Sequence, residues 1–157
     1  MQLSFANQIH YIPPHQHDTT KSATQSHSNQ ADPRTRDDYQ NKGFWANLDW
    51  KPNAKRLHDF IIRYNPHVLS AYTGRDATSK TGKMKWVKKN TGFKRGNIHL
   101  VLRSQKQKYA TTNEKPNILI DDYDKNIREW EAAGGIGILH DGNVGKTISE
   151  LKRLGFK

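Results

Sequence analysis

The chain has 157 residues, of which 33% are hydrophobic, so it is long enough to bury one small core but not two. Its 26 Lys and Arg outnumber 15 Asp and Glu, and the formal net charge of +11 favours anionic partners such as nucleotides, nucleic acid or phosphorylated substrates. The absence of cysteine excludes a disulfide framework and a thiolate zinc site, and without a membrane span or a secretory signal we expect a soluble, cytoplasmic protein with no membrane partner.

Residues 1–42 differ in composition from the rest of the chain. The stretch from His15 to Gln40 is rich in small polar residues and has almost nothing to bury, which predicts a disordered or divergent segment. A strand could form only ahead of Pro13-Pro14, from the apolar residues Leu3, Phe5, Ile9, Tyr11 and Ile12. We therefore expect the folded domain to cover residues 43–157.

From Gly43 onward, stretches with helical periodicity alternate with short apolar runs, a pattern typical of a parallel sheet with flanking helices. The strands are expected at residues 67–71, 98–102, 117–120 and 136–139. Helices are expected after Pro52, at residues 80–89 and 105–110, after Asp121-Asp122, and from Val144. This order predicts a Rossmann-like α/β fold.

Polar residues follow the expected strands, and in an open parallel sheet ligands bind at the carboxyl ends of the strands. These residues are Ser70, Arg103, Ser104, Lys106, Lys108, Asp121, Asp122 and His140. Two adjacent carboxylates repel each other unless a cation offsets their charge, and Mg²⁺ usually needs only one or two carboxylates plus substrate phosphate. A hydroxyl and a lysine nearby would complete a phosphate site. The pair Asp121-Asp122 is therefore the candidate metal position.

Several stretches of the sequence resemble one known family, the 5'(3')-deoxyribonucleotidase-like branch of the haloacid dehalogenase-like hydrolases, particularly versions carried by tailed phages. The resemblance covers about Gly43 to Phe156. It rests on GFWANLDWKPNAKRLHDFI, HVLSA, RSQKQKYA, ILIDDYDKNIREWEAAGGIGILH and ISELKRLGF, of which the block around Asp121 is the most specific.

The resemblance implies a function and a set of site residues. Ser70, with Ala71 beside it, corresponds to the family's second motif and would bind phosphate. Lys106 corresponds best to the third motif, with Lys108 as the alternative, and both would bind phosphate. Ser70 and Lys106 are the implied catalytic residues, and Asp121-Asp122 corresponds to the acidic pair that holds Mg²⁺. The implied activity is a magnesium-dependent phosphomonoesterase acting on a nucleotide or another phosphate ester, in the host cytoplasm if the protein is phage-encoded.

The family's first motif is missing. In the family an apolar strand is followed by Asp-x-Asp, whose first Asp attacks phosphorus and whose second is the general acid/base. Residues 1–42 contain no such sequence. Asp122-Tyr123-Asp124 is the one Asp-x-Asp in the chain, but the sequence that follows it fits the fourth motif better. The resemblance therefore implies a core truncated at its N-terminal part, whose exposed strand edges favour weak stability or pairing with a partner chain.

Other interpretations of these features stay open. Asp121-Asp122 could merely offset the dipole of the helix that follows. A basic run with two aromatic residues could bind nucleic acid or simply form the solvated side of a helix, and it comprises Lys80, Lys83, Lys85, Lys88, Lys89, Lys94 and Arg95 with Trp86 and Phe93. The chain could thus be an active phosphatase, a catalytically dead phosphate-binding remnant, or a basic nucleic-acid-binding module. The missing nucleophile favours the second over the first.

Overall fold

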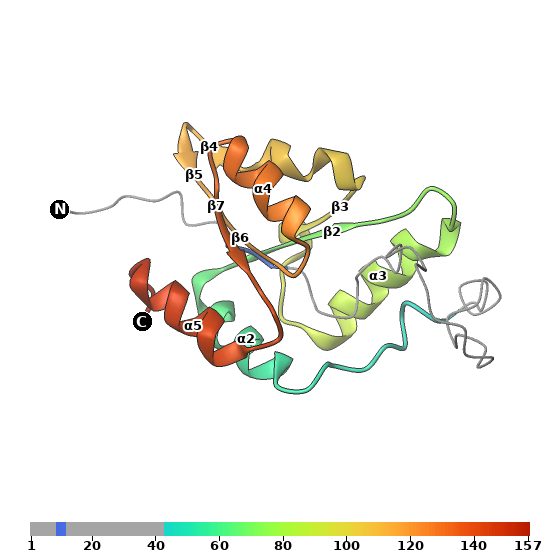
Figure 1. Cartoon of the computed structure of the whole chain (residues 1–157). Helices are drawn as coiled ribbons and strands as arrows, with labels where there is room; N and C mark the ends of the chain where they lie inside the picture. The colour runs from blue at the N-terminus through green and yellow to red at the C-terminus, as the bar shows by residue number, and fades with distance from the viewer. Residues whose placement is uncertain (1–8, 12–42) are drawn as a thin grey trace, which may run out of the picture.

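The computed structural model describes residues 9–11 and 43–157, and it is built around a five-stranded parallel sheet (Figure 1). The strands lie in the order β3-β2-β1-β6-β7. Their bounds are β1 (Ile9–Tyr11), β2 (His67–Ala71), β3 (Ile98–Val101), β6 (Ile118–Asp121) and β7 (Ile136–Leu139). The order places β1 at the centre, with two strands on either side.

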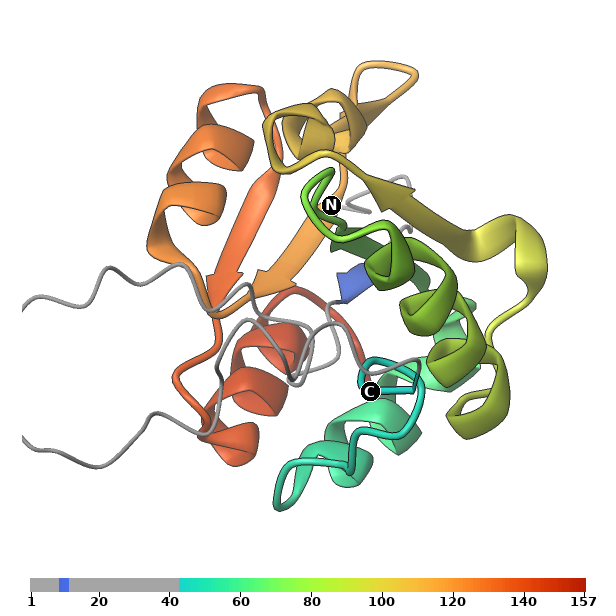
Figure 2. The same ribbon diagram turned by 90° about the vertical axis from the view of Figure 1, so that its right-hand side faces the viewer.

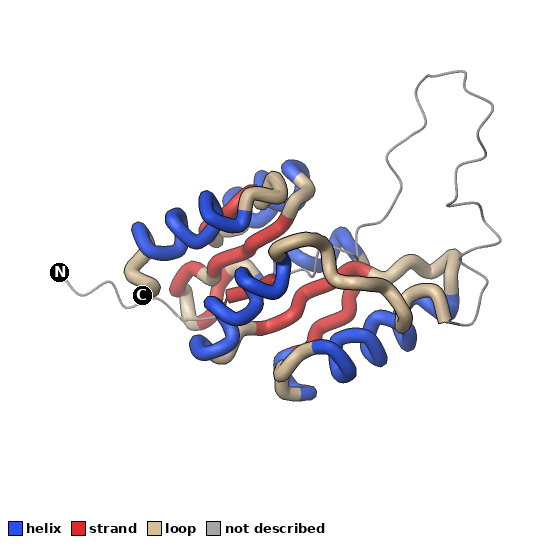
Figure 3. Tube along the Cα trace, turned by 90° about the horizontal axis from the view of Figure 1, so that it is seen from below, coloured by secondary structure: helices blue, strands red, loops and turns tan. Residues whose placement is uncertain are grey.

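Helices cover both faces of this sheet (Figures 1 and 3). One face packs against α2 (Ala54–Ile61), α3 (Ala77–Asn90) and α5 (Val144–Arg153), and the other against α4 (Asp124–Ala132) and the 3₁₀ helix η3 (Arg103–Tyr109). Shorter elements are η1 (Ile62–Tyr64), η2 (Arg95–Asn97) and the hairpin of β4 (Thr111–Thr112) and β5 (Lys115–Pro116). The parallel sheet and its two helical layers confirm the α/β class.

Each face of the sheet has its own hydrophobic core, because successive residues of a strand point to opposite faces. The larger core joins Val68, Ile120 and Ile138 to apolar residues of α2, α3 and α5. The smaller core joins Leu69 and Leu119 to side chains of α4 and to Ala110. The strands are therefore apolar on both faces, as expected for a parallel sheet between two helical layers.

Local sequence accounts for where two of the helices begin. The side chain of Asp76 accepts a hydrogen bond of 2.8 Å from the backbone N–H of Thr78 and caps α3. Asn143 accepts one of 3.0 Å from the backbone N–H of Lys146 and caps α5. Both caps satisfy backbone donors that have no partner within the helix.

The structure corrects one expectation about the sheet. Tyr11 of β1 is the register partner of Val68 in β2 and of Ile120 in β6, so the N-terminal segment supplies the central strand. A domain beginning at residue 43 would leave out the middle strand of the described sheet. The expected disorder of His15–Gln40 lies outside the described residues.

The other elements lie close to where the sequence predicts them. The helix expected after Pro52 begins at Ala54, because Asn53 takes a left-handed conformation with φ of 62°. The helix expected at residues 105–110 is a 3₁₀ helix that already begins at Arg103. The β4–β5 hairpin was not predicted. Within the described ranges no helix is both long and apolar enough to cross a membrane.

Candidate functional site

The sheet order identifies the edge at which a ligand would bind. From β1 the chain proceeds to β2 and β3 on one side, and it returns to β6 and β7 on the other. In such sheets ligands bind outside the carboxyl ends of the strands, where the strand order reverses. Asp121 is the last residue of β6, which pairs directly with β1. The predicted acidic pair is therefore at the position that this topology favours.

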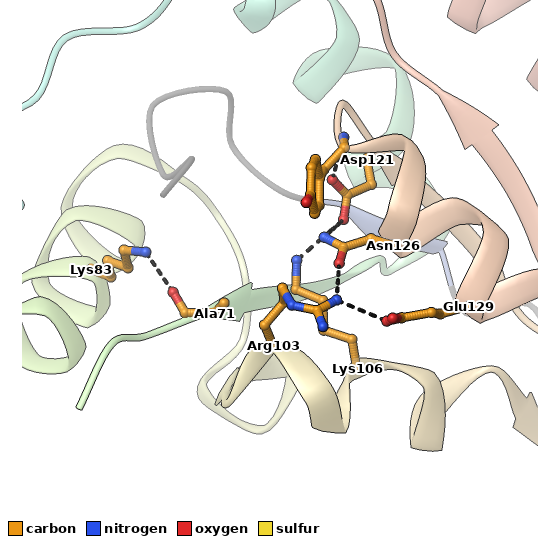
Figure 4. A network of polar contacts seen from close by, with 8 residues as sticks. Ala71, Lys83, Arg103, Lys106, Asp121, Asn126 and Glu129 are labelled. Atoms are coloured by element: carbon orange, nitrogen blue, oxygen red, sulfur yellow. Dashed lines mark hydrogen bonds and ion pairs between the residues drawn. The ribbon is translucent and has the colours of Figure 1, made fainter. Parts of the chain in front are cut away.

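The carboxylate of Asp121 is buried, and among the described residues Lys106, Asn126 and the backbone of Tyr123 donate to it (Figure 4). Its Oδ2 atom accepts hydrogen bonds from Lys106 Nζ at 3.2 Å and from Asn126 Nδ2 at 2.8 Å. Its Oδ1 atom accepts one from the backbone N–H of Tyr123 at 2.9 Å. The contact with Lys106 is an ion pair in which the exposed fractions of the side chains are 6% and 0%. The structure thus brings together two of the predicted site residues.

The pairing follows from the elements that carry these residues. Lys106 is on η3, and Asn126 is in the first turn of α4, which begins just after the end of β6. Burial lowers the pKa of Lys106, while the negative charge and hydrogen bond of Asp121 oppose that shift. Since each charge would be costly to bury alone, the ion pair and the amide of Asn126 stabilise both charges together.

A second cation lies next to this pair (Figure 4). One terminal nitrogen of the Arg103 guanidinium donates to Asn126 Oδ1 at 3.3 Å and to Glu129 Oε2 at 2.8 Å. Asn126 therefore links the buried Lys106–Asp121 pair to the Arg103–Glu129 pair. The exposed fractions of Arg103 and Glu129 are 39% and 32%, so the network extends from the core to solvent.

Asp122, the second acid of the predicted pair, is exposed at the same strand end. Mg²⁺ takes oxygen ligands and keeps several waters, so one or two carboxylates and a substrate phosphate can hold it. Among the described residues no group of three or more His, Cys, Asp or Glu could bind a metal ion by itself. Asp121 and Asp122 therefore fit Mg²⁺ by donor type, in a site that would need phosphate to complete it.

Ser70 is separated from this network. The ladder pairs Ser70 with Leu100, which places it on the face covered by α2, α3 and α5, whereas Asp121 alternates to the face covered by α4. The side chain is fully buried, and its Oγ atom has no hydrogen-bond partner in the described part of the chain. An unpaired buried hydroxyl is unusual. Ser70 would need movement of its neighbours to contact a ligand.

Ala71, the last residue of β2, contributes its backbone to a different contact. Its carbonyl oxygen accepts a hydrogen bond from Lys83 Nζ, away from the Asp121 network (Figure 4). Lys83 is only 3% exposed and lies 4.6 Å from the centroid of the Trp45 ring. The interpretation of the whole basic run as a solvated helix side is therefore wrong for Lys83, which anchors α3 to the end of β2.

Lys108 and His140 have other surroundings. Lys108 is exposed and outside the network, so Lys106 is the lysine that the structure pairs with Asp121. The backbone N–H of His140 donates to the carbonyl oxygen of Asp121 at 2.8 Å. Its ring Nδ1 is 2.7 Å from Thr147 Oγ1, and burial lowers its pKa. His140 thus fixes the backbone at the end of β6 without joining the charged network.

Two members of the network were missed in the sequence, Asn126 and Glu129. Both lie on α4, on the turns that face η3, and neither residue type is distinctive on a polar helix. A signal was present in the spacing, since Asn126 follows Asp121 by five residues and so falls in the first turn of the helix after the strand. Comparisons with models of protein families, with curated proteins and with solved structures find no match for this chain.

Proposed function

We propose that this chain binds phosphate monoesters of nucleotide type together with Mg²⁺, on a Rossmann-like core of the haloacid dehalogenase type. The observation that carries the proposal is the buried Lys106–Asp121 pair at the carboxyl end of β6, beside the central strand. The resemblance to 5'(3')-deoxyribonucleotidases supports the same assignment.

Each residue of the network has a role in this proposal. Lys106 Nζ would neutralise charge on a phosphoryl oxygen, and its burial strengthens that interaction because little water screens it. Asp121 orients Lys106, while Asn126 and the backbone of Tyr123 fix the carboxylate. Arg103, held by Glu129, offers a second cation nearer to solvent. Mg²⁺ held by Asp121 and Asp122 would add positive charge at the phosphoryl oxygens.

The missing first motif determines what this site does to its ligand. In the sequence, β1 is followed by Ile12, Pro13 and Pro14, and no carboxylate occurs before Asp18. Without an aspartate directly after the central strand, no residue in the family's position can attack phosphorus. We therefore propose a phosphomonoesterase-type domain that binds its ligand and turns it over slowly or not at all.

Calorimetric titration with thymidine 5'-monophosphate, with and without Mg²⁺, tests the proposal. We expect binding that Mg²⁺ strengthens, and a loss of at least about tenfold in Lys106→Met, because one charge-assisted contact is worth about 1.5–3 kcal/mol. Lys108→Met, an exposed lysine two residues away, is the matched control and should bind as the unmodified protein does. Absence of binding by the unmodified protein in the presence of Mg²⁺ would refute the proposal.

Lys106→Met also leaves Asp121 buried without its cation, so a second pair of variants separates binding from folding. Asp122→Asn changes an exposed side chain and should keep the fold while weakening the effect of Mg²⁺ on nucleotide affinity. Asp124→Asn is its control, since Asp124 is exposed and pairs with Arg128 at 2.9 Å. A phosphate-release assay on the same samples measures turnover, and rapid release would contradict the binding-only assignment.

A further inference from the structure

The positive charge of this protein is concentrated in one part of the chain. Residues 77–113 contain ten Lys or Arg and no Asp or Glu, whereas the whole chain has a net charge of +11. This stretch covers α3, η2, β3 and η3. The nearest acids in the sequence are Asp76 before this stretch and Glu114 after it. Asp76 already accepts hydrogen bonds from the backbone N–H of Thr78 and from Trp45 Nε1, the latter at 2.6 Å. No acidic side chain from this stretch neutralises its cations.

Most of these cations are on the surface of the described part of the chain. Seven of the ten are exposed, Lys108 on η3 and six on α3 and the segment that follows it: Lys80, Lys85, Lys88, Lys89, Lys94 and Arg95. In the part of the chain that the structure describes, none of the six forms an ion pair, and Lys80 has an aromatic partner, the ring of Tyr72 at 4.9 Å. Four other exposed cations do pair with nearby acids: Lys125, Arg128, Lys146 and Arg153.

Three of these exposed lysines lie on the same side of α3. At about 100° per residue, Lys85, Lys88 and Lys89 fall within an arc of about 100°, opposite the side that buries Trp86 and Val87. Lys94 and Arg95 follow directly after the helix. Figure 2 shows α3 and the segment that joins it to β3 on the outside of the sheet. We define these five residues, 85, 88, 89, 94 and 95, as the α3 basic surface.

Helix stability accounts for only part of this arrangement. Lys88 and Lys89 are in the last turn of α3, where cations interact favourably with the helix dipole. That explanation does not extend to Lys85 in the middle of the helix or to Lys94 and Arg95 beyond its end. Because this stretch has no acids, its cations also repel one another, and like charges on one surface destabilise the fold.

We propose that the α3 basic surface binds the sugar-phosphate backbone of nucleic acid, independently of base sequence. The phosphates of a nucleic acid form a dense row of negative charge that matches clustered, unpaired lysines. The proposal does not depend on the phosphate site at Asp121, because no residue is shared between them.

The surroundings of this surface favour nucleic acid over a protein or a membrane. Protein interfaces are centred on buried apolar anchors, and interfacial membrane helices have an apolar face. The large hydrophobic residues exposed in the described ranges are Leu102, Tyr123 and Leu139, and none of them is on α3. Trp86 and Phe93, which were candidates for stacking on bases, are 0% and 8% exposed. Contacts are therefore to phosphates rather than to bases.

Fluorescence anisotropy with a labelled 20-base-pair duplex at several salt concentrations tests the proposal. The variant Lys85→Gln/Lys88→Gln/Lys89→Gln should bind at least tenfold more weakly than the unmodified protein. The slope of log K against log salt should fall in magnitude by about 2.7, because each phosphate contact contributes about 0.9. The control Lys55→Gln/Lys152→Gln/Lys157→Gln removes the same charge from exposed positions on α2, on α5 and near the C-terminus, and should bind nearly normally.

Four results would overturn the proposal. These are no binding of the duplex, equal losses in the two triple variants, a strong preference for one of two unrelated duplex sequences, and binding of phosphatidylserine vesicles in place of the duplex. Equal losses would mean that net charge alone attracts DNA. Because all six substituted side chains are exposed, circular dichroism of both triple variants should match that of the unmodified protein.

Discussion

His67 of β2 and His99 of β3 form a pair of imidazoles on one face of the sheet. Their Nδ1 and Nε2 atoms are 2.8 Å apart, and the ring planes differ by 4°. Burial lowers the pKa of both histidines, and the proximity of His99 lowers that of His67 further. One ring must accept the hydrogen bond that the other donates, so the pair is stable only while at least one imidazole is neutral.

This pair predicts a loss of stability in mild acid. Below pH 6.5 the unfolded chain binds protons that the folded histidines resist, so the free energy of unfolding should fall as the pH decreases. Above that pH both histidines are neutral in the folded and in the unfolded protein, so their contribution to the free energy of unfolding no longer changes with pH. Urea unfolding between about pH 5 and pH 8 measures the slope. His99→Gln should make it shallower, and an unchanged slope in this variant would contradict the prediction.

At the scale of single residues, the sequence predicted the site in part. Lys106 and Asp121 were identified because each follows a predicted strand, and strand ends converge at one edge of a parallel sheet. Ser70 was also at a strand end, but the alternation of β2 directs it to the other face. Spacing could place Asn126 in the first turn after β6, but its contacts and those of Glu129 depend on how closely α4 approaches η3, which is a tertiary contact.

Among the elements, β7 and the residue before it lie close against α4 at two glycines, Gly135 and Gly137. A Cβ atom at Gly135 would lie 2.2 Å from Trp130 Nε1, and one at Gly137 would lie 2.6 Å from Ile127 Cγ2. Trp130 is fully buried, and its Nε1 donates to the carbonyl oxygen of Asn117 at 3.1 Å. The ring therefore has little freedom to move away.

We expect Gly135→Ala to destabilise the protein by about 1–3 kcal/mol, the usual cost of overpacking a well-packed core. Gly96→Ala is the control, since a Cβ atom there meets nothing within 4 Å. That variant should change the free energy of unfolding by less than about 1 kcal/mol. Urea denaturation of the two variants checks the difference, and similar values for both would mean that α4 can shift without cost.

The principal helices and strands could be predicted because the pattern of apolar residues that indicates each of them lies within the element itself. β2, β6 and β7 are short apolar runs, and α2 and α5 repeat apolar residues at helical spacing. The β4–β5 hairpin could not, because its strands have two residues each and one of them contains Pro116. Its turn residues, Asn113 and Glu114, have positive φ angles of 49° and 62°. Glutamate is not typical of such a turn, which favours Asn, Asp and Gly.

For the molecule as a whole, the most consequential feature is the central position of β1. It has only three residues, yet His10 has a register partner in each neighbouring strand, His67 in β2 and Leu119 in β6. The sequence offered Ile9 and Tyr11 as a strand but could not place it, because pairing between distant segments leaves no local pattern. The two halves of the sheet are joined through this strand.

This position predicts an unequal response to two substitutions of His10. Proline removes a backbone N–H and is found almost only at sheet edges, so His10→Pro should lower the free energy of unfolding by several kcal/mol and expose the edges of β2 and β6. His10→Ala keeps the backbone donor and serves as the control. Urea denaturation and sedimentation velocity measure stability and self-association. Equal effects of the two substitutions would mean that the backbone N–H of His10 contributes no hydrogen bond to the sheet.

The ladder that pairs Ile9 with Ile118 also has a consequence for biosynthesis. Ribosomes add roughly 5–20 residues per second, so about 5–20 s separate the synthesis of β1 from that of its neighbour β6. Of the two strands that pair with β1, β2 is made before β6 and can pair with it first. Contacts between segments so distant in the chain slow folding, because a long loop must close before they form. The central pairing of the sheet, between β1 and β6, therefore cannot form until most of the chain has been made.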